Sequence, residues 1–210
     1  MSEFIQAPFN KTRKDKFIAV IPAPKGLRDI QSKFRRGNTT ILPDSFILSI
    51  VGTVAPPVVV PAIANRYSGQ THNVTSYTRE PWPPLTFSFT IDNRFNNYWY
   101  IYKWLDILND DQTGIYDNAD VTNVRVIETT KSGAQITNFD RAIQYYSTDI
   151  SLYAVDEYEK RVIEFKYTRA FPTKLGGLDF SYREGDEMAV TVEFAYSQFT
   201  ASLVDYVESL

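Results

Sequence analysis

The chain has 210 residues, 43% of them hydrophobic and 22% charged, which is ordinary for a folded globular domain and excludes an intrinsically disordered chain. It has no cysteine and one histidine, His72, so disulfides, thiol nucleophiles and multi-histidine metal sites are excluded. The net charge of −3 is uneven, because residues 1–40 carry nine basic and three acidic residues while the rest carries 13 and 22. We expect a basic arm ahead of an acidic body.

Proline and aromatic residues then indicate the kind of fold. Ten of the eleven prolines precede residue 85, so residues 1–44 should be a loop-rich, extended N-terminal arm. Two short apolar runs, 17–21 and 46–51, end at proline or glycine and read as edge strands. Aromatic residues make up 15% of the chain, which favours β-strands over helices, and no apolar run is long enough to span a membrane.

The pattern is clearest after residue 84. Residues 85–92 alternate apolar and polar side chains, as a strand with one buried face does. Apolar residues then recur every three or four positions, which predicts an amphipathic helix over 94–108 with Asp92 or Asn93 as its N-cap. A strand is expected at 121–130 and a turn at 131–133, and 150–155 is a possible strand within a segment, about 117–158, that we interpret as an insertion.

The last third alternates again. Residues 163–168 predict a strand, and 178–182 with 188–196 predict a hairpin around a turn at 184–186. Residues 201–210 should form a short helix or a tail. The expected fold is therefore mainly β, an antiparallel sandwich or barrel over residues 45–200 with one flanking helix.

No group of residues predicts catalysis. His72 has only polar neighbours, and the carboxylate pairs Asp110/Asp111 and Glu184/Asp186 lie in predicted turns, where acidic residues favour solvation and turn formation. Gly176 and Gly177 lack the spacing of a phosphate-binding loop. We expect no catalytic residue, no metal ligand and no cofactor, and a protein that is not an enzyme.

Two groups of residues are candidates for contacts between subunits. The helix has more aromatic side chains than one buried stripe absorbs, so some of them should contact something beyond the core, and a protein partner is favoured over a sugar. The basic arm could bind nucleic acid, but docking on the acidic body of a neighbouring subunit is favoured. The candidate interface residues are Lys11, Arg13, Lys14, Lys16, Trp99, Tyr100 and Trp104.

Four pieces of the sequence in order resemble the tail tube proteins of contractile-tailed bacteriophages, which are related to the inner-tube proteins of contractile bacteriocins and type VI secretion systems. The pieces are LTFSFTID at 85–92, YKWLDIL at 102–108, Gly114-Ile115-Tyr116, and FKYTRAFPTKLGGLDFSYREGDEMAVTVEFAYSQF at 165–199. The resemblance covers about residues 45–200. It leaves open whether the chain is the repeating tube subunit or a ring at the baseplate or the head-proximal end.

The resemblance implies a structural virion protein that forms stacked, hexameric rings of the inner tail tube or of the tube-baseplate junction. Its partners would be copies of itself, tail sheath and baseplate or tail-terminator proteins, with transient passage of DNA and no membrane anchor. It would be found in the phage tail, and in the host cytoplasm during assembly. Residues on the polar faces of the strands should face the lumen or solvent: Thr86, Ser88, Thr90, Thr191 and Glu193.

One alternative function comes from the aromatic residues. An aromatic-rich β-sandwich could bind carbohydrate at the host-recognition end of a tail, with Trp82, Trp99 and Trp104 as stacking platforms. Loss of glycan binding on replacement of Trp99 would favour this function over that of a tube subunit.

Overall fold

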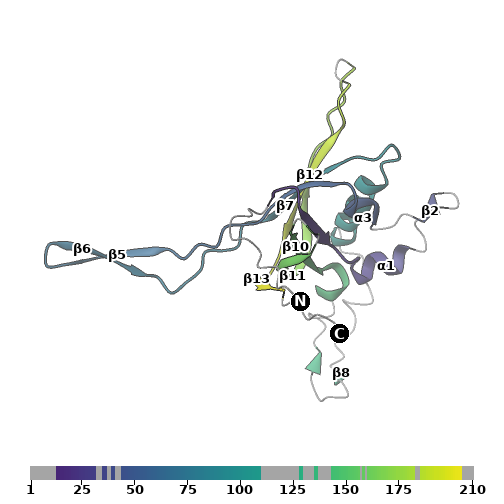
Figure 1. Cartoon of the computed structure of the whole chain (residues 1–210). Helices are drawn as coiled ribbons and strands as arrows, with labels where there is room; N and C mark the ends of the chain where they lie inside the picture. Colours follow the sequence, from purple (N-terminus) through teal and green to yellow (C-terminus); the bar gives the residue numbers. More distant parts are fainter. Residues whose placement is uncertain are drawn as a thin grey trace, which may run out of the picture.

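A computed structural model gives the conformation of residues 13–31, 35–36, 39–40, 44–109, 128–129, 135–136, 143–156, 158, 160–182 and 185–204. Its main feature is a body built on antiparallel strands, with helix α3 (Asn96–Leu108) on one side and a long hairpin projecting from the other (Figure 1). The expectation of a mainly β fold with one flanking helix is confirmed.

Seven strands form the main sheet, in the order β1-β10-β11-β12-β7-β4, with β13 pairing to β11 off this path. They are β1 (Phe17–Val20), β4 (Ile50–Val54), β7 (Leu85–Thr90), β10 (Thr148–Val155), β11 (Arg161–Leu175), β12 (Ala189–Ala195) and β13 (Gln198–Leu203). All the pairings are antiparallel. The apolar run at 17–21 supplies β1, which lies at one end of this order, so its prediction as an edge strand is confirmed. The run at 46–51 contributes only its last two residues to β4, the strand at the other end, and its first two residues belong to a helix instead.

The remaining strands form three small hairpins apart from the main sheet. They are β2 (Arg35–Arg36) with β3 (Thr39–Thr40), β5 (Ala62–Tyr67) with β6 (Gln70–Thr75), and β8 (Glu128–Thr129) with β9 (Gln135–Ile136). The hairpin of β5 and β6 is the long projection in Figure 1.

The long strand β11 joins two parts of the sheet. Residues 161–170 pair with β10, and the last five residues pair with β12. Between the two parts lies a bulge, because Thr148 pairs with Ala170 while Ile150 pairs with Tyr167. Arg169 has a φ of 54° there, and its N–H donates to Asp149 Oδ1 at 3.1 Å instead of to a backbone oxygen. The bulge lets one strand change partners without leaving that N–H unsatisfied.

The core lies between the sheet and the helices. Strand β7 buries Leu85, Phe87 and Phe89, as its alternation predicts, and β12 buries Val190, Val192 and Phe194. The ring of Phe87 meets that of Phe194 edge to face at 5.8 Å. Phe46 contributes from α2 (Asp44–Ile47), where a strand was expected, and its ring meets Phe89 at 5.1 Å. Aromatic edge-to-face contacts therefore hold much of the interior together.

Helix α3 starts two residues later than expected, and its N-cap position is Phe95, not Asp92 or Asn93. The side chain of Asp92 still binds backbone N–H groups at this end of the helix. The Oδ1 atom of Asp92 accepts hydrogen bonds from the N–H of Arg94 at 3.0 Å and of Asn96 at 2.8 Å. Asn97 is fully buried, and its amide donates to the carbonyl of Thr90 at 2.7 Å. These bonds satisfy N–H groups that the helix leaves free at its start, and they tie the helix to the end of β7.

The N-terminal segment belongs to the body from residue 17, which differs from the domain boundary expected at residue 45. Strand β1 pairs with β10, and helix α1 (Lys25–Gln31) follows it. Ile21 and Leu27 are buried in the common core. Gly26 lies so close to Tyr145 that a Cβ there would meet the ring at 2.7 Å. Apolar side chains at alternate and helical spacings bury this segment despite its positive charge.

Two other expectations also differ from the structure. Residues 148–155 form β10, next to β11 in the sheet, so the end of the expected insertion is part of the fold. Residues 178–182 form no strand, because β11 ends at Leu175 and β12 begins at Ala189. The expected turn at 131–133 and most of the strand at 121–130 lie outside the described residues, and residues 201–203 belong to β13, not to a terminal helix or tail.

Candidate assembly surfaces

Open strand edges are the first feature of the surface. Strands β1 and β4 lie at the two ends of the strand order, and β13 has β11 as its partner in the described part of the chain. Apolar side chains are exposed on all three of these strands: Val51 and Val54 on β4, Val20 on β1 and Leu203 on β13. An edge strand with free backbone groups and exposed apolar side chains is a template for pairing with another chain.

The hairpin of β5 and β6 is the second feature. All its described side chains are exposed, including Ile63 and Val74, and the run from Val58 to Val60 that leads into it from β4 is exposed as well. An isolated two-stranded hairpin is marginally stable in water, because it has no layer to pack against. A hairpin this exposed is expected to pack against another molecule.

Aromatic packing fixes the return segment of this hairpin on the body. The ring of Trp82 lies 5.6 Å from that of Phe199 on β13 and 6.2 Å from that of Tyr196. The guanidinium of Arg79 lies over the Trp82 ring, 5.4 Å from its centre. The base of the hairpin is thus held at β13, one of the open edges.

A polar face covers β7 and β12 on the side away from the core. The side chains of Thr86, Ser88 and Thr90 are half-buried, that of Thr191 is exposed, and that of Glu193 is half-buried. Adjacent positions pair in register, Thr86 with Glu193 and Ser88 with Thr191. Glu193 also accepts a hydrogen bond from Lys174 Nζ at 2.9 Å. None of the five lies in the core, so their expected lumen-facing or solvent-facing role stays open as a prediction.

A second polar face on β10 and β11 carries charge. Hydrogen bonds from Ser151 and then from Tyr153, whose hydroxyl lies 2.8 Å from Oε1, hold the pKa of Glu164 below its ordinary value. Arg161 lies over the ring of Tyr153 at 4.4 Å, and Lys166 Nζ lies 3.3 Å from Asp149 Oδ2.

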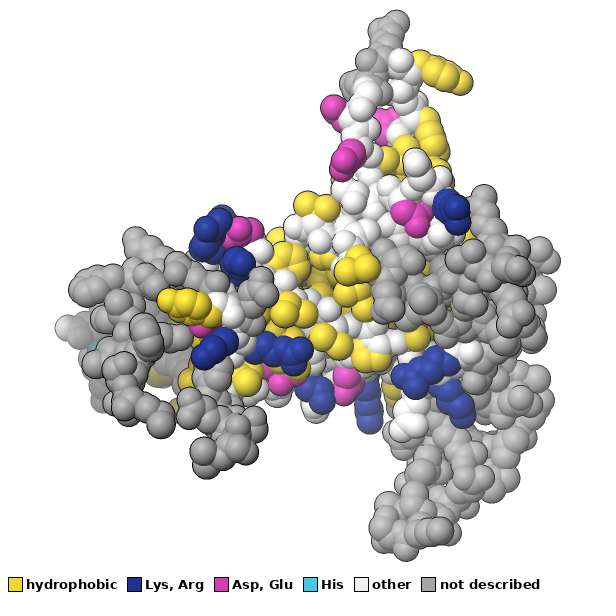
Figure 2. Space-filling view, turned by 45° about the vertical axis from the view of Figure 1, so that its right-hand side comes forward, with side chains coloured by type: hydrophobic (Ala, Val, Ile, Leu, Met, Phe, Trp, Pro, Cys, Tyr) yellow, Lys and Arg dark blue, Asp and Glu magenta, His cyan; other side chains and the backbone are white. Residues whose placement is uncertain are grey.

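Figure 2 shows apolar side chains over the middle of one side of the body, with Lys and Arg along its lower border.

Comparison with known proteins identifies the family to which this chain belongs. The family model described as phage tail tube protein matches residues 22–202. The chain belongs to the phage tail tube protein family. The resemblance noted in the sequence is therefore confirmed, and the match begins well before residue 45.

Solved structures share the fold of this tail tube protein at low sequence identity. The tube-terminating cap of the anti-feeding prophage has 12% identity and a TM-score of 0.53, covering 93% of each chain. A sheath-tube complex of the extracellular contractile injection system PVC in the extended state has 10% identity and a TM-score of 0.53, covering 97% of this chain and 99% of the other. No curated protein matches the sequence.

The tail tube fold buries two of the three helix aromatics that were expected at a subunit interface. Trp104 is fully buried, and its Nε1 donates to the carbonyl of Tyr146 at 2.7 Å. Tyr100 is also in the core, against Phe46 and Trp104. Only Trp99 remains at the surface, half-buried beside Lys103. Tyr100 and Trp104 are therefore corrected to core residues, because α3 buries a wider face than one stripe.

The expected basic interface residues differ in their surroundings. Lys11 lies outside the described residues, and Arg13 is paired with Asp15 at 2.9 Å, which lowers the pKa of that carboxyl. Lys14 is exposed and Lys16 is half-buried, and the backbone of Lys16 adjoins β10. His72 lies exposed on β6. In the described ranges there is no group of three metal-ligating side chains, and no helix long and apolar enough to cross a membrane.

Two tyrosines with buried hydroxyls should make this tail tube protein less stable at alkaline pH. The hydroxyls of Tyr167 and Tyr196 have no hydrogen-bond partner among the residues that the structure describes, and burial raises the pKa of both groups. The folded chain then keeps these protons to a higher pH than the unfolded chain. The free energy of unfolding should therefore be unaffected below pH ~10 and should fall as the pH rises further.

Replacement of Tyr167 by phenylalanine tests this prediction. At neutral pH, the free energy of unfolding of Tyr167→Phe should equal that of the wild type or exceed it by up to ~1 kcal/mol, because the substitution removes an unpaired polar group. Its free energy of unfolding should also fall less than that of the wild type when the pH is raised to ~11, as measured by urea unfolding followed by far-ultraviolet circular dichroism. Tyr158→Phe, at an exposed position, should leave both values unchanged. An alkaline decline equal to that of the wild type would contradict the assignment to Tyr167.

Proposed function

We propose that this tail tube protein is the subunit of a ring in the inner tube of a contractile tail, closed by pairing of strand edges between copies. The observation that carries the proposal is the pair of edge strands, β1 and β4, at the two ends of one sheet. Different edges on one subunit make a head-to-tail contact, and such contacts form a closed ring when the rotation between subunits completes a circle. A ring also removes the exposed edges that otherwise favour aggregation.

Hexameric rings would stack into a hollow tube, with the β5-β6 hairpin as a contact to an adjacent copy. The exposed apolar side chains of the hairpin and of the run before it then become buried. Burial of apolar surface contributes ~25 cal/mol per Å², so a hairpin contact can stabilise stacking substantially. The N-terminal residues before β1 would reach the same or the next ring.

The tube would be a conduit for DNA. A lining with few cations binds phosphates weakly, so that DNA can slide, whereas a lysine-rich lining would release counterions and hold it. The polar face of β7 and β12 suits such a lining. The charged side chain on this face, Glu193 of β12, is paired with Lys174 of the neighbouring strand β11.

The partners proposed with this function are tail sheath and baseplate or tail-terminator proteins, in the virion and in the host cytoplasm during assembly. The subunit is proposed to act without catalysis. The carbohydrate-binding alternative has little support, because Trp104 is in the core and Trp82 is stacked against Tyr196 and Phe199. Both are unavailable as open stacking platforms.

Charges placed on the β4 edge test ring closure. Val51 and Val54 are exposed, so the variant Val51→Lys/Val54→Lys should fold as the wild type does. It should fail to form rings in negative-stain electron microscopy of concentrated protein, because lysine side chains on an edge strand oppose its pairing with another strand. Tyr158→Lys is the control, since Tyr158 is exposed and lies outside every strand. Rings formed equally well by the edge variant would overturn closure through β4.

A further inference from the structure

The connection between β11 and β12, residues 176–188, is named the acidic loop here. It projects beyond the body at the end of the sheet (Figure 1). The loop leaves the sheet at Gly176, whose N–H donates to the carbonyl oxygen of Thr191 at 2.7 Å. A Cβ at that position would lie 3.1 Å from the same oxygen, so glycine permits the close approach. The departure of the loop from the body is therefore built into the backbone.

Large aromatic side chains are exposed on the acidic loop. Phe180 is 70% exposed, and Tyr182 is as exposed as in an extended peptide. With Met188 they line an open pocket of about 570 Å³. Exposed apolar groups gathered around a hollow typically mark a contact with another molecule.

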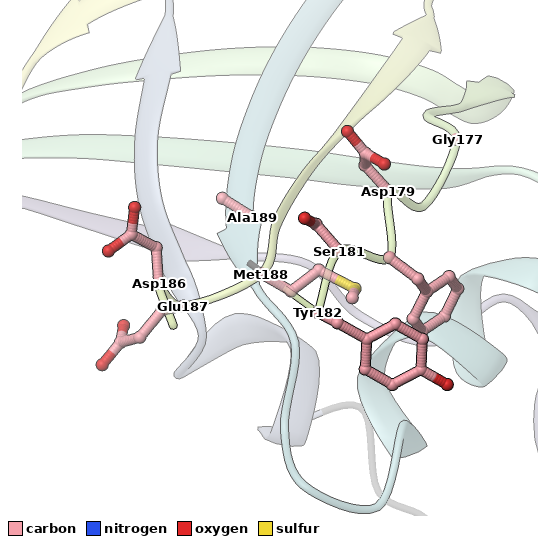
Figure 3. Close-up of a pocket in the computed structure, with 9 residues that line it drawn as sticks. Gly177, Asp179, Ser181, Tyr182, Asp186, Glu187, Met188 and Ala189 are labelled. Atoms are coloured by element: carbon pink, nitrogen blue, oxygen red, sulfur yellow. The ribbon is translucent and has the colours of Figure 1, made fainter. Parts of the chain in front are cut away.

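The same pocket is acidic. Asp179, Asp186 and Glu187 line it, and Figure 3 shows the last two pointing away from the ring of Tyr182. Residues 176–188 carry four acidic residues and one basic residue, a formal charge of −3. A partner that fits must supply cations beside an apolar side chain, because it has to match both parts of the lining.

One segment of the same sequence has this composition. Residues 33–36 read Lys-Phe-Arg-Arg, which is three cations with one aromatic residue among them. Strand β2 begins at Arg35, and Figure 1 shows β2 and the acidic loop projecting from the body in different directions. Strand β2 of one copy therefore projects away from its own acidic loop, which favours a complementary contact between two copies.

We propose that the acidic loop of one copy docks residues 33–36 of a second copy. Phe34 enters the apolar side of the pocket beside Phe180 and Tyr182, and the cations lie against the carboxylates. Arginine suits this contact, because its guanidinium pairs with carboxylates and stacks on aromatic rings. The contact joins different surfaces on the two copies, so it is repeated along an assembly. It rests on the proposed self-assembly of this chain and names a second pair of surfaces for it.

Engineered disulfides test the contact directly, because the chain has no cysteine of its own. Full-length Tyr182→Cys and full-length Phe34→Cys are mixed and oxidised at low salt. A disulfide-linked dimer containing one copy of each variant is expected, with a yield that falls as salt is raised. Tyr158→Cys replaces Phe34→Cys in the control mixture, and that mixture should give little dimer.

Charge reversal then tests specificity. Addition of Asp186→Lys/Glu187→Lys to the Tyr182→Cys chain should lower the dimer yield about tenfold or more. Addition of Arg35→Glu/Arg36→Glu to the Phe34→Cys chain should restore it. Reversal of Asp15 and Glu80 to lysine instead, both exposed and outside the loop, changes the net charge equally and should have no effect.

The outcomes separate this contact from ring formation. The contact is overturned if the Tyr158→Cys partner gives an equal dimer yield, or if charge reversal leaves the yield unchanged. Rings seen by microscopy would then be explained by pairing of the strand edges alone. A specific dimer from a chain that never forms rings would keep the contact and overturn the tube. Recovery of a different basic protein on the loop, with no dimer, would also overturn the proposal.

Discussion

Replacing Trp104 by alanine should lower the free energy of unfolding by about 3–5 kcal/mol, among the largest losses expected for a single substitution in this chain. The side chain is fully buried, and its ring meets that of Phe194 at 5.6 Å and that of Tyr100 at 6.2 Å. Its Nε1 also donates to the carbonyl of Tyr146, which would be left unpaired. Urea unfolding followed by circular dichroism measures the loss.

Trp99 provides the matched control on the same helix. It is half-buried, so Trp99→Ala should cost only about 1–2 kcal/mol. If Trp99 contacts a neighbouring copy, that variant should weaken assembly more than it weakens folding. A Trp104→Ala variant that is as stable as the wild type but fails to assemble would contradict the placement of Trp104 in the core.

Removal of the β5-β6 hairpin should have the largest effect on assembly. Replacing residues 62–75 by a short Gly-Ser linker should abolish stacked tubes in negative-stain microscopy, because the exposed apolar side chains of the hairpin are proposed to contact an adjacent copy. The free energy of unfolding should change by less than ~1 kcal/mol, since every described side chain of the hairpin is exposed.

A milder variant separates loss of the hairpin from loss of its apolar contacts. Ile63→Ser/Val74→Ser keeps the backbone of the hairpin, and the two positions pair directly across it. It should reduce tube length while single rings persist. Tubes of normal length from both variants would show that the hairpin makes no stacking contact.

Periodicity in the sequence predicted the regular elements well. The alternation of Leu85, Phe87 and Phe89 marks a strand whose one face is buried, and the three-and-four spacing marks α3. These patterns are visible because a strand or helix with one buried face repeats its apolar residues at a fixed period. The position of Asp92 near the start of the helix could also be predicted, although the N-cap residue is Phe95.

The rest depended on long-range contacts. The positive charge of the first 40 residues suggested a separate arm, yet Ile21 and Leu27 pack into the core, and charge counts do not report burial. The same limit applies to Trp104, since the number of aromatic residues on a helix does not show how wide a face the sheet will cover. The hairpin at 178–182 was expected from alternation alone, which does not show where the ladder between β11 and β12 ends.

The assembly surfaces were predicted only in part. The polar face of β7 and β12 follows from alternation, and the edge position of β1 follows from a short run that ends at proline. Strand β4 lies mostly after the apolar run at 46–51, so that run did not locate it. The β5-β6 hairpin has no such signal. Residues 62–75 lack an alternation between buried and exposed faces, because neither face of the hairpin is buried within one chain.

Electron cryomicroscopy of the purified protein at high concentration tests the central claim most directly. Rings with a central hole are expected, with β1 of one copy paired to β4 of the next and the polar face of β7 and β12 toward the hole. A chain that stays monomeric at every concentration, or rings in which both edges remain open to solvent, would contradict the account.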